Sequence, residues 1–105
     1  SLNYGVSLGL DPKMIFKLLS NGAGQSKMSD LRMPLMIDHA YEPATANMPI
    51  AYKDISVISE DIKSNNCSTP LFDATQKLYD IAKENVPATY DTGAVYEVYR
   101  QKLVK

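Results

Sequence analysis

Residues 47–66 read NMPIAYKDISVISEDIKSNN and hold the longest helical pattern in the chain. Asn47 can cap the first turn, which contains Pro49, and the asparagines Asn65 and Asn66 can end the helix. Between these ends, apolar residues recur at helical spacing. The predicted buried stripe consists of Ala51, Ile55, Ile58 and Ile62. This stretch therefore predicts a long amphipathic helix with one face in a core.

Further helices are predicted on both sides of this stretch. Asp11-Pro12 and Thr69-Pro70 each combine a capping residue with a first-turn proline, while Ser26 and Asp91 can cap two more helices. The residues predicted to be buried in these helices share apolar character and helical spacing. They are Leu2, Val6, Leu10, Ile15, Leu18, Leu19, Met28, Leu31, Leu35, Leu71, Ala74, Leu78, Ile81, Val95, Val98 and Tyr99.

One predicted helix contains a proline. Pro34 lacks an N–H and predicts a kink or an end near Met33. Residues 38–46 and 85–90 lack periodicity and are predicted loops, and no alternating pattern predicts a strand. We therefore expect an all-α fold of about five helices in a compact bundle, with residues 1–105 forming a single domain.

Charge and composition exclude several classes of protein. The 105 residues include 11 basic and 12 acidic side chains, and this net charge of -1 argues against a general nucleic-acid binder. The single cysteine excludes an internal disulfide, and the short apolar runs predict no membrane span. No signal peptide is visible, so we expect a cytoplasmic location, with the mitochondrion left open. Because a helical pattern already runs at Ser1, we expect a piece of a longer protein.

Few residues have the pattern of a metal site or a nucleophile. His39 and Cys67 are the only residues of their kinds, and nothing near them has ligand spacing, so no metal is expected. A Cys67–His39 nucleophile pair is possible in principle, but a small residue before a helix cap is the simpler interpretation. Gly22–Ser26 resembles a phosphate-binding turn, yet it follows a helix and is better explained as a connection between helices.

Lys53 and Asp54 are the charged pair that stands out. They lie early in the longest predicted helix, off its apolar stripe, and adjacent helical residues point about 100° apart, so they are not expected to face each other. One interpretation is a solvated helix face. The other is the edge of a cleft shared with another domain, where the lysine can hold a phosphate, a ribose or a carboxylate.

Taken in order, several motifs resemble the C-terminal part of the 3-hydroxyisobutyrate dehydrogenase family, the β-hydroxyacid dehydrogenases. Gly9–Pro12 resembles the family's GLDP, Gly22–Ser26 its G-x-G-x-S turn, and Tyr52–Ile55 its KDL helix. Thr69–Leu71 resembles the start of the penultimate helix, and Asp91 resembles the residue that begins the last one. The resemblance covers nearly the whole chain and implies the helical fold of the C-terminal domain of 6-phosphogluconate dehydrogenase.

The family resemblance implies a two-domain enzyme whose N-terminal Rossmann domain binds NAD or NADP. Such enzymes transfer hydride between the nicotinamide and a short β-hydroxy acid, and a lysine in a G-x-x-G-x-x-x-K stretch acts as general acid and base. That lysine is expected before Ser1, so no catalytic residue is assigned here and the chain alone is expected to be inactive. The implied partners are the Rossmann domain, the hydroxy-acid substrate and further copies of the same subunit, without nucleic acid or membrane.

Three positions are assigned to the site by the same resemblance. Lys53 matches a lysine that contacts the cofactor near the nicotinamide, and Asp54 matches the adjacent acid that shapes the substrate pocket. The family often has phenylalanine eight residues before that acid, where this chain has Ala46. The departure implies a wider pocket or a different loop.

Two other kinds of function stay open. Seven tyrosines and five methionines can form the surface of a non-catalytic helical module that binds a partner helix or dimerises, although they also suit a core rim. A helix-turn-helix DNA binder over residues 12–37 is a poorer interpretation, because the charge balance disfavours it.

Overall fold

The structure is a computed structural model of the chain and describes residues 1–104. It consists of α1 (Leu2–Ser7), α2 (Pro12–Ser20), α3 (Lys27–Asp38), α4 (Met48–Ser64), α5 (Pro70–Asn85), the 3-10 helix η1 (Thr92–Val95) and α6 (Tyr96–Arg100). No strand forms within residues 1–104, where the only β pairing is an isolated bridge between Asn47 and Asp91. The all-α prediction is confirmed.

The predicted helix starts are confirmed, and all but one have the predicted cap: α5 begins at Pro70 without a cap hydrogen bond from the side chain of Thr69. The side chain of Asp11 accepts a bond from the backbone of Lys13, and that of Asn47 accepts one from Ile50. Ser26 forms a capping box with Ser29 at the start of α3. These caps satisfy backbone N–H groups that have no partner within the helix, so the local sequence sets where each helix begins.

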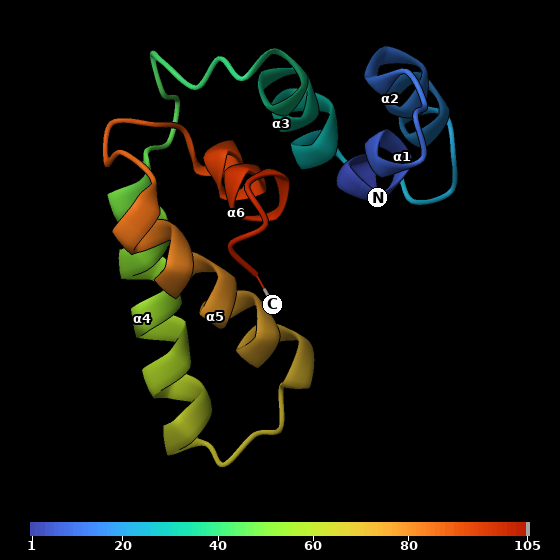
Figure 1. The fold of residues 1–105 in the computed structure, drawn as a ribbon. Helices are drawn as coiled ribbons and strands as arrows, with labels where there is room; N and C mark the ends of the chain where they lie inside the picture. Colours follow the sequence, from blue (N-terminus) through green and yellow to red (C-terminus); the bar gives the residue numbers. More distant parts are fainter. Residues whose placement is uncertain (105) are drawn as a thin grey trace.

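The helices form two groups joined by α3 and α6 (Figure 1). Helices α4 and α5 run antiparallel and diverge toward the loop that joins them, while α1 and α2 lie on the opposite side of α3 and α6. Helix α1 approaches α2 closely at Gly5, where an added Cβ would lie 2.5 Å from Cδ1 of Ile15. No helix in residues 1–104 is long and apolar enough to cross a membrane.

Two hydrophobic clusters hold the groups together. The larger cluster consists of Tyr41, Met48, Ala82, Val86, Ala94 and Val98. The smaller one consists of Leu2, Ile15 and Tyr96. Met36 of α3 packs against both clusters, so α3 connects the α1–α2 pair to the rest of the molecule.

The predicted end of the helix near Met33 is wrong, because α3 continues through Pro34 to Asp38, and the alternative of a kink stays a prediction. Proline removes one hydrogen bond from the helix interior. The residues around it offset that loss by packing: Met33 and Ile37 lie against the smaller cluster and Leu35 lies against the larger one. Tertiary contacts therefore override the local preference here.

Several predicted core residues are exposed. Ile58 is 46% exposed, and the buried face of α4 instead includes Met48 and Ser59. Helix α4 is thus turned relative to the predicted stripe, so that the hydroxyl of Ser59 lies 3.4 Å from Oε1 of Gln76 on α5. The other predicted core residues that the structure leaves exposed are Val6, Leu10, Leu18, Met28, Leu31, Leu71, Ala74 and Tyr99.

Candidate functional site

Lys53 and Asp54 lie in the second turn of α4 with their side chains exposed, at 74% and 60% respectively. The structure corrects the expectation that they do not face each other, because Nζ of Lys53 lies 3.7 Å from Oδ1 of Asp54. The long lysine side chain bridges the angle between neighbouring helical positions. An exposed pair of this kind contributes little to stability, so the ammonium group can readily exchange this partner for another anion.

Ala46 lies just before α4 and is half-buried. Its carbonyl accepts a hydrogen bond of 2.9 Å from the backbone of Thr92, and its N–H lies 3.5 Å from Oδ2 of Asp91. Ala46, Lys53 and Asp54 therefore share one end of α4. The backbone at Ala46 is fixed there, whereas the two charged side chains are not.

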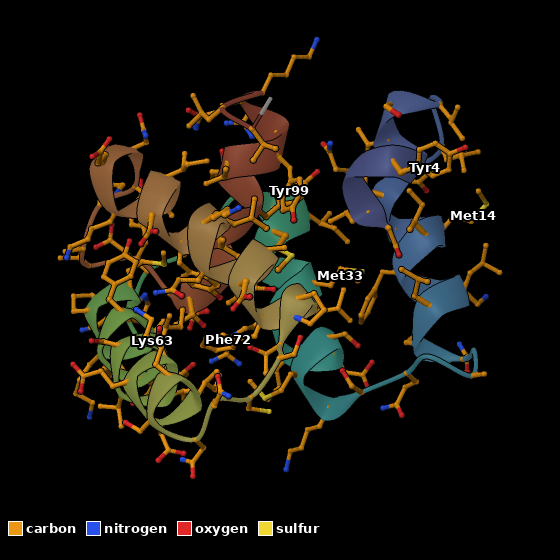
Figure 2. The ribbon with its side chains drawn as sticks, turned by 90° about the horizontal axis from the view of Figure 1, so that it is seen from below. Tyr4, Met14, Met33, Lys63, Phe72 and Tyr99 are labelled. Atoms are coloured by element: carbon orange, nitrogen blue, oxygen red, sulfur yellow. The ribbon has the colours of Figure 1, made fainter. Side chains whose placement is uncertain are left out.

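Three of the pockets on the described part of the chain are well formed, and none of these three is lined by Ala46, Lys53 or Asp54. A mainly apolar pocket of about 400 Å³ lies between the α1–α2 pair and the α3–α6 side, where Figure 2 shows Met33 and Tyr99. A pocket of about 300 Å³ separates α4 from α5. Its wall includes Tyr52, the residue before Lys53 in the sequence, and does not include Lys53 itself.

Asp91 is the most interconnected residue at this end of the molecule, and its side chain is 1% exposed. Burial alone raises the pKa of a carboxyl group, but hydrogen bonds from Gly93, Thr45 and Ala46 together with the charge of Arg32 hold the pKa of Asp91 below its usual value. The sequence predicted only the helix cap. Arg32 and Thr45 are 59 and 46 positions away in the chain, and no local pattern signals those contacts.

Glu97 forms a second buried acidic centre that sequence reasoning missed. Its carboxylate accepts hydrogen bonds from the hydroxyl of Tyr41 at 2.7 Å and from Nε of Arg100 at 2.7 Å, while Nδ1 of His39 lies 3.1 Å away. Burial opposes the charge, yet these bonds and one from Gln101 lower the pKa of Glu97 to about 2. Burial and the same carboxylate raise the pKa of Tyr41.

The remaining candidates for chemistry lie apart from Lys53. His39 ends α3 and contacts Glu97, while Cys67 is exposed in the loop between α4 and α5. Within residues 1–104, no three His, Cys, Asp or Glu side chains gather as a metal site. Gly22–Ser26 joins α2 to α3, as the interpretation of this stretch as a connection between helices predicts.

The chain is similar to a family of known proteins. Residues 1–99 match a family described as NAD-binding of NADP-dependent 3-hydroxyisobutyrate dehydrogenase. The chain is 31% identical over 93 residues to glyoxylate/succinic semialdehyde reductase 2, chloroplastic, of Arabidopsis thaliana. It is 24% identical over 99 residues to L-threonate dehydrogenase of Cupriavidus necator.

A solved structure has the same fold. The crystal structure of 3-hydroxyisobutyrate dehydrogenase from Salmonella typhimurium matches 92% of this chain with a TM-score of 0.85 at 20% sequence identity. The matched regions cover 89% and 94% of this chain but only 26% and 33% of the two relatives. The chain therefore spans about a quarter to a third of the length of the proteins it resembles.

Proposed function

This chain belongs to the family of NADP-dependent 3-hydroxyisobutyrate dehydrogenases, and from this premise we propose that it is the C-terminal helical domain of a nicotinamide-dependent oxidoreductase. The enzyme transfers hydride between NAD or NADP and a short β-hydroxy acid. The observation that carries the nicotinamide-dependent activity is the family match over residues 1–99 of a chain of 105. The order of the motifs in the sequence supports the C-terminal placement. The fold of residues 1–104, which is helical throughout, supports a domain that closes a site rather than one that holds the dinucleotide.

The described residues fit one edge of a nucleotide site. Gly22–Ser26 follows a helix, whereas a dinucleotide-phosphate loop follows a strand. Lys53, by contrast, is an exposed cation whose only ion pair among residues 1–104 is the exposed Asp54. Such an ammonium can donate charge-assisted hydrogen bonds to a phosphate, a ribose or a carboxylate. In this proposal a Rossmann domain binds most of the cofactor and Lys53 reaches it from the helical side.

The roles proposed for the other two residues follow from the resemblance to the family, and both residues lie at the same end of α4 as Lys53. Asp54 orients the ammonium group of Lys53, from which it lies 3.7 Å away. Ala46 would border a substrate pocket that the Rossmann domain completes, where its small side chain leaves room that a phenylalanine would fill. When bound, the nicotinamide supplies the hydride acceptor or donor. The lysine that acts as general acid and base is expected outside this chain, so we propose that the chain alone is inactive.

Replacement of Lys53 tests the proposal in the full-length enzyme. We expect Lys53→Ala to raise the KM for the cofactor by about tenfold or more, because a charge-assisted hydrogen bond contributes about 1.5–3 kcal/mol. The melting temperature should not change, since the side chain is 74% exposed. The matched control is Lys63→Ala, an exposed lysine ten positions further along the same helix. Unchanged kinetic constants in Lys53→Ala, or equal changes in both variants, would contradict the assignment.

A second candidate function rests on the apolar surface of α1 and α2. Tyr4 is 70% exposed and Leu18 is 66% exposed. Figure 2 shows Tyr4 and Met14 on the side of these helices that faces away from α4. An exposed apolar surface of this kind suits a helical interaction module or a homo-oligomer. The two functions can coexist, and a full-length protein without nicotinamide-dependent activity would favour the interaction module alone.

A further inference from the structure

The carboxylate of Asp91 has more hydrogen-bond donors than a helix cap requires. Oδ1 accepts the cap bond from the backbone N–H of Gly93 at 2.9 Å and lies 3.3 Å from Nε of Arg32. Oδ2 accepts from the hydroxyl of Thr45 at 3.1 Å and from its N–H at 3.3 Å, with the N–H of Ala46 at 3.5 Å. The first oxygen thus caps η1, and the second binds the loop that leads into α4.

Backbone bonds join the same two segments. The N–H of Met48 donates to the carbonyl of Tyr90, and the N–H of Thr92 donates to the carbonyl of Ala46, both at 2.9 Å. Met48, the first residue of α4, is fully buried. The residues before and after Asp91, Tyr90 and Thr92, therefore also hold the start of α4 through their backbone groups.

Beyond the first turn of α4, Ser59 is the one buried residue. Val57 and Ile58 are 61% and 46% exposed, and the helix diverges from α5 toward the loop that joins them (Figure 1). A helix fixed at one end takes its direction from that end. The residues that fix the start of α4 therefore also set where Lys53, in its second turn, is presented.

We infer that Asp91 is a positioning residue for the cofactor edge of the site, because its buried carboxylate fixes Ala46 and the start of α4 and so directs Lys53. This inference rests on the proposed function. A neutral amide cannot replace the carboxylate: an NH2 group in place of Oδ2 would face the N–H groups of Thr45 and Ala46. In place of Oδ1 it would face the N–H of Gly93 and lie beside the guanidinium of Arg32, whose Nε–H donates to the hydroxyl of Thr92.

The Asp91→Asn variant tests the inference in the chain itself by amide NMR. We expect chemical-shift changes over residues 44–54 that exceed those over residues 70–80 of α5, because the lost acceptor anchors the start of α4. Changes confined to residues 91–95 would overturn the inference and leave Asp91 a simple helix cap. If Asp91→Asn fails to fold, Thr45→Val is the second variant, since it keeps the carboxylate and removes one exposed donor. It should give smaller shifts in the same segment, and their absence would also overturn the inference.

Kinetics of the full-length enzyme provide the second measurement. Asp91→Asn should lower kcat/KM for the cofactor by about tenfold per folded molecule, because a displaced binding group loses productive geometry. A purely structural role would lower the melting temperature and leave the kinetics of the folded fraction unchanged, and that result would overturn the inference. If the wild-type enzyme has no nicotinamide-dependent activity, the proposed function fails, whereas the NMR measurement still decides whether Asp91 positions α4.

Discussion

The segment of residues 91–98 and the pair of helices α1 and α2 differ in how many of their residues are buried. Six of the eight residues from 91 to 98 are buried, including the acids Asp91 and Glu97. Over residues 2–20, only Leu2, Gly5 and Ile15 are buried, although apolar residues recur there at helical spacing. A regular apolar pattern therefore does not mark the centre of this fold. The centre is a short segment in which buried carboxylates and small residues meet several helices at once.

The sharpest test of this contrast compares two methionines. Met48 is fully buried at the start of α4, whereas Met14 of α2 is 44% exposed. We expect Met48→Ala to lower the free energy of unfolding by about 2–5 kcal/mol, because it removes buried atoms and leaves a cavity. Met14→Ala is the control and should change it by no more than about 0.5 kcal/mol. Urea denaturation measures both, and similar losses at the two sites would show that the two regions are equally packed.

The acid dependence of stability tests the buried carboxylates. The pKa of Glu97 is lowered from 4.5 to about 2, so the unfolded chain takes up this proton first as the pH falls. Stability from Glu97 is thus present above its unfolded pKa and is lost as the pH falls toward the folded value. We expect Glu97→Gln to cost about 1–3 kcal/mol at pH 7 and this deficit to shrink between about pH 5 and 2. Denaturation at several pH values measures it, and a deficit independent of pH would contradict the assignment.

The smallest effect is expected at the contact of α1 with α2. A Cβ at Gly5 would lie 2.5 Å from Cδ1 and 3.1 Å from Cγ1 of Ile15. Gly5→Ala should destabilise the protein by about 1 kcal/mol, because overpacking slightly exceeds the gain in helix propensity. The Ile15→Val background removes Cδ1 and should reduce the cost of Gly5→Ala. Additive effects in thermal unfolding of the double variant would show that the two residues do not press on each other.

The comparison also explains what could be predicted from the sequence. Helix starts at Asp11, Ser26 and Asn47 depend on residues a few positions away, and these predictions are confirmed. The course of α3 through Pro34 and the buried face of α4 depend on packing against distant segments. The spacing of apolar residues does not show which face meets a neighbour, so Ile58 was predicted to be buried and is exposed.

In the candidate site, too, the local sequence predicts which side chains are exposed but not which distant residues they contact. Lys53 and Asp54 were singled out because they lie off the apolar stripe, and both are exposed. Their roles at a cofactor stay predictions. The wider role of Asp91 was not visible, since a helix cap needs only Gly93 two residues on, whereas its second oxygen binds Thr45 from another part of the chain.

The exposed Cys67 lies in the loop where α4 turns back into α5, far from the fixed start of α4. It is the only thiol in the sequence, so a maleimide fluorophore would attach at one known point without any engineered cysteine. A dye at this end of α4 lies far from the fixed start of the helix, so a small rotation of α4 about its start moves the dye by a larger distance. The sequence thus supplies a reporter that would register, in real time, whether the far end of α4 moves relative to its start.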